Sequence, residues 1–224
     1  KELFTLVESV TLRDSVSHNI FKDNPRVAYA PDVIFQLALE SKGDAQNNIV
    51  GFSLIDLPSR QSLSQYNEQY EKFILHHISN AIAEGKSVRL FSFCNYESDN
   101  LVCERIVAQL GEEEQKCVEI VTYDGEIESF LNSLREVDLL YASRFHAAIL
   151  GISMQIPTIP VVYSDKTINV LFDLRYKGDI VDIRSLGEIT RDLTIQVMER
   201  RVIDELIKSS QNHFRLIDEL VTQR

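Results

Sequence analysis

From residue 48 onward, the chain alternates short runs of β-branched and apolar residues with longer amphipathic segments, and this alternation constrains the fold most. The apolar runs predict strands at 48–55, 87–93, 117–123, 138–142 and 158–163. The segments between them have apolar residues at helical spacing and predict helices at 64–85, 98–111, 124–137, 144–153 and 166–174. Strands alternating with helices indicate a parallel sheet covered on both faces, a doubly wound, Rossmann-like α/β fold.

The two ends of the chain do not continue this alternation. Residues 1–45 hold short strand-like runs and a break at Pro31, and we expect them to be the tail of a preceding domain. Between Leu193 and Val221, apolar residues recur on one helical face, which predicts one long helix or a pair of helices. The expected domain boundaries therefore lie near residues 45 and 190.

The charge balance bears on the class of partner. The chain has 44% hydrophobic residues, enough for a sizeable core, and its 23 Lys and Arg are outnumbered by 34 Asp and Glu. With a formal net charge of −11, it lacks the broad basic surface that nucleic acids require, so nucleic acid is not an expected partner. A small anionic ligand would have to be held by a local cluster of cations.

Cysteine spacing gives no sign of a metal site. Cys94, Cys103 and Cys117 form no C-x-x-C pair and no Cys/His metal spacing, so we expect buried, reduced thiols and no required metal. We also expect no signal peptide and no membrane-spanning segment, because no apolar window is long enough. A cytoplasmic location is the default expectation, with peripheral membrane association left open.

The most informative polar residues follow two successive strands of the predicted sheet. Arg144 and His146 come directly after one strand, and Ser164 and Lys166 come after the next. In open α/β sheets, ligands bind beyond the carboxyl ends of the strands, where helix N-termini add partial positive charge. The pattern suits a small dianion such as a phosphate ester, with a bidentate contact from Arg144 and a point charge from Lys166. His146 could hold a phosphate or move a proton near neutral pH.

A purely structural interpretation of these residues is also open. Polar residues in the first helical turn are common in α/β proteins. Arg144 could then be an exposed first-turn residue and His146 a half-buried histidine packed under the sheet. Spacing alone does not separate the two interpretations.

The stretch "YASRFHAAILGISMQIPTIPVVYSDKTINVLFDL" (141–174) resembles the most characteristic segment of the polysaccharide pyruvyl transferase family. That segment has an S-R-x-H helix start, a small-residue A-x-x-x-G-x-P packing stretch and a Y-S-x-K loop. "VTLRDSVS" (10–17) and "YAPDVIF" (29–35) are similar to the S-x-R-D and P-D elements of the family, whereas 48–135 matches mainly in element order. One departure is Gln155-Ile156-Pro157 in place of a more usual Gly-Val-Pro, which should affect packing more than chemistry.

The resemblance implies a two-domain enzyme of the glycosyltransferase-B type that transfers a pyruvyl group from phosphoenolpyruvate to two sugar hydroxyls as a cyclic ketal. Such a transferase serves surface or exopolysaccharide biosynthesis, needs no cofactor and acts on a glycan or lipid-linked sugar acceptor. In this interpretation the chain is incomplete. Residues 1–45 end a truncated N-terminal Rossmann-like domain, 46–190 form a C-terminal Rossmann-like donor-binding domain, and 191–224 form a helical segment.

The resemblance also assigns residues to the donor site. Arg144 and His146 match the motif that binds phosphoenolpyruvate, and the backbone around Phe145 would approach the ligand. His146 would be the catalytic residue, either protonating the methylene carbon or steadying the leaving phosphate. Which of these two roles it plays stays open.

Further substrate-binding residues follow from the other motifs. Tyr163, Ser164 and Lys166 match the loop after the second strand. Arg13 matches the R-D element, and it either faces the cleft or pairs with Asp14 or a neighbour. Asp32 is either a base at the domain junction or, more simply, a turn residue after proline.

The remaining histidines favour structural roles. His77 lies on the apolar stripe of its predicted helix, which indicates core packing, and His76 beside it would lie at a solvated edge. His18 could join the cleft, because it follows the R-D element, but it fits a surface helix more simply. His213 has no chemical partner in the sequence.

Two other functions compete with pyruvyl transfer. A sugar-nucleotide-dependent glycosyltransferase could use the same glycosyltransferase-B-type fold. A catalytically silent binding or scaffolding domain is the third alternative.

Overall fold

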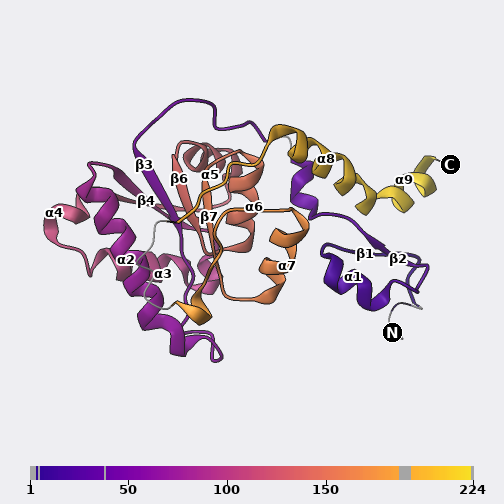
Figure 1. Cartoon of the computed structure of the whole chain (residues 1–224), viewed down its shortest axis with the longest axis horizontal. Coiled ribbons are helices and arrows are strands. Elements are labelled where there is room, and N and C mark those ends of the chain that lie inside the picture. The colour runs from indigo at the N-terminus through magenta and orange to yellow at the C-terminus, as the bar shows by residue number, and fades with distance from the viewer. Residues whose placement is uncertain (1–3, 5, 38, 187–192, 223–224) are drawn as a thin grey trace. The chain divides into compact units, whose positions relative to one another are not determined.

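A computed structural model describes residue 4 and residues 6–37, 39–186 and 193–222 (Figure 1). The chain divides into two compact units. The six-stranded unit comprises Glu40–Tyr163 and Lys177–Val197, and the two-stranded unit comprises Lys1–Leu39, Ser164–Tyr176 and Met198–Arg224. Each unit is named after its sheet and is described by itself.

The six-stranded unit is built on a parallel sheet with strand order β5-β4-β3-β6-β7-β8. Its strands are β3 (Ile49–Ser53), β4 (Ser87–Ser92), β5 (Val118–Thr122), β6 (Leu139–Ala142), β7 (Thr158–Val162) and β8 (Val181–Asp182). The connecting helices are α2 (Asn67–Ala83), α3 (Asp99–Val107), α4 (Glu112–Gln115), α5 (Ile127–Arg135) and α6 (Phe145–Ser153). Short 3₁₀ helices lie at η3 (Ser64–Tyr66), η4 (Asn95–Glu97) and η5 (Ile183–Ser185).

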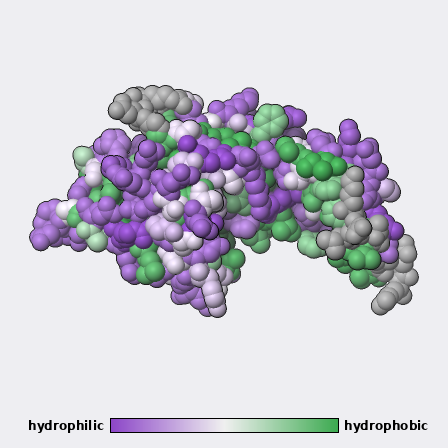
Figure 2. Space-filling view, turned by 90° about the horizontal axis from the view of Figure 1, so that it is seen from below, coloured by the Kyte–Doolittle hydropathy of each residue, from purple (hydrophilic) through white to green (hydrophobic). Residues whose placement is uncertain are grey.

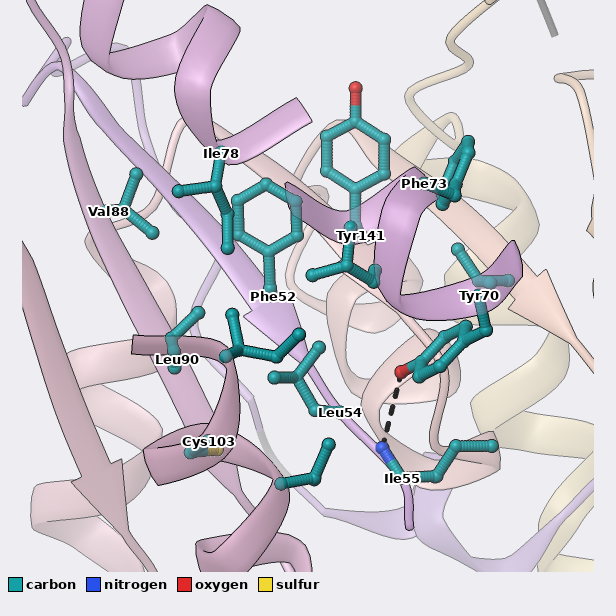
Figure 3. Packing of buried hydrophobic residues seen from close by; sticks show 14 of the residues in the cluster. Phe52, Leu54, Ile55, Tyr70, Phe73, Ile78, Val88, Leu90, Cys103 and Tyr141 are labelled. Carbon is teal, nitrogen blue, oxygen red and sulfur yellow. Dashed lines mark hydrogen bonds between the residues drawn. The ribbon is translucent and has the colours of Figure 1, made fainter. Parts of the chain in front are cut away.

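Helices cover both faces of this sheet. Alternate strand residues point to opposite sides, so both faces carry apolar side chains that must be buried. On the face covered by α2 and α3, Phe52 stacks on Tyr141 with ring centroids 4.8 Å apart, and Phe73 of α2 packs edge-on against Tyr141 (Figure 3). On the face covered by α5, Phe91 meets Phe130 with centroids 5.6 Å apart. The predicted doubly wound, Rossmann-like α/β fold is therefore confirmed.

The small-residue stretch in α6 lets this helix approach the sheet closely. A Cβ atom added to Gly151 would lie 2.5 Å from Oγ1 of Thr158 on β7 and 2.8 Å from a methyl carbon of Leu140 on β6. Any larger side chain at this position would push α6 away from the two strands. The backbone of α6, and with it the start of the helix, is thus held firmly on the sheet.

The two-stranded unit contains a small parallel sheet and several helices. Strands β1 (Val10–Leu12) and β2 (Val27–Tyr29) pair in parallel and are connected by α1 (Ser15–Phe21). The unit also holds η2 (Val33–Gln36), α7 (Asp165–Asp173), α8 (Arg200–Ser210), η6 (Gln211–His213) and α9 (Arg215–Thr222). Ser15 joins α1 to α7, since its backbone N–H and its hydroxyl both donate to the Asp173 carboxylate, at 2.6 and 2.5 Å.

All five strands predicted from residue 48 onward are present, with ends shifted by at most two residues. The C-terminal segment forms a pair of helices, but the first begins at Arg200, because residues before it take part in an antiparallel bridge between Gln196 and Thr158 of β7. The domain boundaries expected near residues 45 and 190 remain predictions. In the described part of the chain, no helix has both the length and the apolar character needed to cross a membrane.

Candidate functional site

The strand order reverses between β3 and β6, because the chain runs outward through β4 and β5 before it returns beside β3. Ligands of open α/β sheets bind at such a switch point, beyond the carboxyl ends of the strands. Here the turn after β6 is fixed to β3. The backbone N–H of Ser143 donates to the Ser53 carbonyl at 3.0 Å, and the backbone N–H of Arg144 donates to Oγ of Ser53 at 3.2 Å. The start of α6 therefore has a defined position at the switch point.

Arg144 lies at this position and is held by two carboxylates. It is the N-cap residue of α6, in an extended conformation, and only 11% of its side chain is exposed. Its guanidinium makes a bidentate pair with Asp99, in which Nε donates to Oδ2 at 2.9 Å and Nη2 donates to Oδ1. The remaining nitrogen, Nη1, donates to Oε2 of Glu97. The interpretation of Arg144 as an exposed surface residue is therefore wrong.

The protonation of Arg144 is secured by these contacts. Burial by itself lowers the pKa of the Arg144 guanidinium, but the hydrogen bonds to Asp99 and Glu97 outweigh burial and raise it above its usual value. Burial raises the pKa of the Asp99 carboxyl, and the hydrogen bonds from Arg144 oppose that shift. The guanidinium remains a permanent cation at the switch point.

Asp99 is itself positioned by the loop between β4 and α3. Its side chain is fully buried, and its Oδ2 accepts a hydrogen bond from the backbone N–H of Cys94 at 2.9 Å. The preceding residue, Ser98, has φ 63° and ψ 27°, a left-handed conformation that is uncommon for a residue with a side chain. This turn lets two carboxylates separated by one residue, Glu97 and Asp99, reach the same guanidinium.

A second arginine completes the group. Arg60, in the loop after β3, pairs with Glu97, and its guanidinium lies over the ring of Tyr163 at 5.3 Å from the centroid. Hydrogen bonding to Arg144 lowers the pKa of the Glu97 carboxyl, so this group is an anion at neutral pH. We refer to Arg60, Glu97, Asp99, Arg144 and Tyr163 as the arginine–carboxylate cluster.

The next two residues of the predicted site open α6. Phe145 is half-buried and His146 is exposed, with their ring centroids 5.1 Å apart. The alternative of a half-buried His146 packed under the sheet is therefore wrong. The imidazole of His146 is thus exposed in the first turn of α6, and its role toward a ligand stays a prediction.

The other predicted residues lie in the two-stranded unit. Ser164 is the N-cap residue of α7, where its hydroxyl lies 3.4 Å from that of Thr167, and Lys166 is exposed in the first turn. Arg13 pairs with Asp32, and its role as a ligand-binding residue stays a prediction. Asp32 also caps η2 by accepting from the backbone N–H of Ile34 at 3.1 Å, as the turn interpretation predicts. A joint role of these residues with His146 stays a prediction.

The histidine on the apolar stripe of α2 is half-buried and packs against the core residues Phe73 and Tyr141. Nδ1 of His77 lies 3.0 Å from the Tyr141 hydroxyl, and burial lowers the pKa of His77 to about 4. Within the described part of the chain, its buried Nε2 has no hydrogen-bond partner. His76, the next residue on the same helix, is exposed, as expected. In the two-stranded unit, Nε2 of His213 lies 2.7 Å from the carbonyl oxygen of Pro31, a partner that the sequence did not indicate.

Among the described residues, no group of three or more His, Cys, Asp and Glu is arranged to hold a metal ion. The three cysteines are free thiols. Only Cys103 is buried, and Cys94 and Cys117 are half-buried, so the expectation of three buried thiols is wrong for two of them. The absence of a metal requirement stays a prediction.

Three members of the cluster were missed by sequence reasoning. Arg60 follows β3, and Glu97 and Asp99 follow β4, so all three come after the carboxyl end of a strand in the same sheet. The rule that drew attention to Arg144 applies equally to them. The sequence therefore carried the same signal for these three residues as for Arg144.

Comparison with protein families agrees with the motifs. The model of the family described as polysaccharide pyruvyl transferase matches residues 1–165, which include Arg13, Arg144, Phe145 and His146 and end just before Lys166. No curated protein and no solved structure matches the chain. Because the matched residues make up well over half of the sequence, the chain belongs to the polysaccharide pyruvyl transferase family.

Proposed function

We propose that this protein transfers a pyruvyl group from phosphoenolpyruvate to a sugar of a surface or exopolysaccharide, forming a cyclic ketal. Family membership supports a pyruvyl transferase that acts on a glycan. The observation that carries the choice of donor is the guanidinium of Arg144, which is held at the switch point of the sheet beside the exposed His146. Asp99 engages Nε and Nη2 of this guanidinium, and Nη1, which pairs with the exposed Glu97, can donate charge-assisted hydrogen bonds to a carboxylate or phosphate of the donor.

The reaction follows from the chemistry of the donor. Arg144 neutralises the carboxylate or phosphate, and His146 in its protonated form donates a proton to the methylene carbon, leaving an oxocarbenium-like centre at the adjacent carbon. One sugar hydroxyl attacks that centre and loses its proton. Loss of inorganic phosphate regenerates the cationic centre, and a second hydroxyl closes the ketal with release of another proton. The balance is one phosphoenolpyruvate and one diol giving one ketal and one phosphate, without a cofactor.

Calorimetry with the full-length protein tests the donor assignment. Arg144→Lys keeps a cation beside Asp99 but removes the planar guanidinium that can contact Asp99 and the donor at the same time, so phosphoenolpyruvate affinity should fall about tenfold or more. Arg89→Ala is the matched control, because Arg89 also pairs with two carboxylates, Glu119 and Glu136, but projects from within β4. Unchanged affinity in Arg144→Lys contradicts the assignment. A nucleoside diphosphate sugar that raises the melting temperature while phosphoenolpyruvate does not would favour a glycosyltransferase.

We also propose that the two-stranded unit is part of a second Rossmann-like domain, as in a glycosyltransferase-B-like enzyme. The unit β1-α1-β2 is a parallel strand–helix–strand unit, and parallel sheets require apolar cover on both faces. Leu6 and Ile20 are 79% and 67% exposed, which indicates that this cover is incomplete within the described residues. Sequencing the coding region upstream of Lys1 tests the proposal, which fails if that region encodes no further strand–helix units.

A further inference from the structure

The arginine–carboxylate cluster brings two guanidiniums to one oxygen atom. Oε2 of Glu97 accepts hydrogen bonds from both Arg60 and Arg144. Two planar cations that converge on one carboxylate oxygen define the geometry of an oxyanion site. Arg60 comes from the loop after β3 and Arg144 from the turn after β6, so the convergence lies at the switch point of the sheet.

The three partners of this arrangement are anchored to different degrees. Arg144 is fixed by its bidentate pair with Asp99, which is fully buried. Arg60 lies over the Tyr163 ring, a stacking contact that does not involve Glu97. The Glu97 side chain is 47% exposed and projects from the three-residue helix η4. Both cations thus have a second anchor, and the shared carboxylate is the most exposed member.

We propose that Arg60 and Arg144 bind one anionic group of the donor at the position of Glu97 Oε2, and that Glu97 competes with the donor for this subsite. The inference rests on the proposed function and extends it, because it adds Arg60 as a substrate-binding residue and Glu97 as a built-in competitor. Ion pairs of exposed carboxylates are weak, whereas buried bidentate pairs are hard to break, so Glu97 leaves and Asp99 stays.

The charge of the ligand favours this exchange. A phosphate group carries more negative charge than a carboxylate and offers three acceptor oxygens, enough to satisfy both guanidiniums at once. With Glu97 displaced, the cluster retains two arginines against the single carboxylate of Asp99, a net positive subsite in a chain of formal charge −11. A local excess of cations is what a small anion requires against such an overall field.

Calorimetric titration of phosphoenolpyruvate into the full-length protein tests the proposal at constant ionic strength. Glu97→Gln preserves the size of the side chain and removes the competing charge, and it should tighten binding about three- to tenfold. Arg60→Ala should weaken binding about tenfold or more, and Glu97→Gln should have a smaller effect in the Arg60→Ala background, where Glu97 competes for Arg144 alone. Glu136→Gln is the control, since Glu136 is an exposed partner of Arg89, and it should leave the affinity unchanged.

Inorganic phosphate as a second probe separates this inference from the proposed function. If the wild type binds phosphoenolpyruvate but Glu97→Gln leaves the affinity unchanged or weakens it, the inference is overturned and the function stands. If phosphoenolpyruvate does not bind, while phosphate binds more tightly to Glu97→Gln and more weakly to Arg60→Ala, the subsite stands and the donor assignment fails. Absence of binding by either probe overturns both.

Discussion

The two units of the molecule differ in how completely they bury their apolar residues. In the six-stranded unit, every residue of β7 is buried, and Phe52, Leu90 and Ile78 have no exposed surface. In the two-stranded unit, α1 has no buried residue, and Phe172 of α7 is 78% exposed. On the face drawn in Figure 2, hydrophobic side chains reach the surface among hydrophilic ones.

The difference follows from the number of strands and helices available to each sheet. Six parallel strands with helices on both faces bury a continuous core, whereas two strands cannot enclose their own side chains. The arginine–carboxylate cluster lies in the unit with the complete core. Buried packing behind the strand ends keeps Arg144 and Asp99 in one geometry, which a site for a small anion needs.

The largest expected effect contrasts one aromatic residue from each unit. Phe52→Ala should lower the free energy of unfolding by about 3–5 kcal/mol, because Phe52 is fully buried and stacks on Tyr141. Phe172→Ala should change it by less than about 0.5 kcal/mol, because Phe172 is mostly exposed. Urea denaturation followed by circular dichroism measures both. Similar losses for the two variants would mean that Phe172 is covered in solution.

Ion pairs should show the same contrast. Asp99→Ala leaves Arg144 without its bidentate partner and should destabilise by about 3 kcal/mol. Asp204→Ala breaks an exposed pair with Arg200 in α8 and should cost at most about 0.5 kcal/mol. Chemical denaturation measures the free energy of unfolding of both variants. An equally small loss of this free energy for Asp99→Ala would show that the cluster is open to water.

The close approach of α6 to the sheet predicts a smaller effect. Gly151→Ala should destabilise by about 1–3 kcal/mol, because its Cβ would contact Thr158 and Leu140. Gly111→Ala serves as the control, since the nearest atom to an added Cβ there is a side-chain oxygen of Glu114 at 3.4 Å. Thermal unfolding of the two variants should separate them by several degrees. Equal melting temperatures would contradict the packing described for α6.

The smallest effect concerns pH. Because burial lowers the pKa of His77 to about 4, below the value of about 6.5 in the unfolded chain, neutral His77 stabilises the fold above pH 6.5. That contribution is lost as the pH falls from 6.5 to 4. Because the ring is partly exposed, we expect the free energy of unfolding to fall by about 1 kcal/mol over this range. His77→Leu should flatten the dependence of the free energy of unfolding on pH in this window. An unchanged slope would assign the loss to other groups.

Local sequence patterns predicted the six-stranded sheet and part of the candidate site. The alternation of apolar runs and amphipathic segments predicted the strands of the six-stranded sheet, because side-chain periodicity reflects which face of an element is buried. The position of Arg144 and His146 after a strand predicted their place at the carboxyl edge. The motif around them also led to the correct family.

Contacts between distant segments were decided only by the tertiary structure. Arg144 meets Asp99 and Glu97, and Glu97 meets Arg60, because the order β5-β4-β3-β6 brings the ends of β3, β4 and β6 to one edge. The grouping of α7 with the N-terminal strands was likewise not visible in the sequence. Periodicity is a property of neighbouring residues, whereas an ion pair across a sheet depends on the order in which the strands assemble.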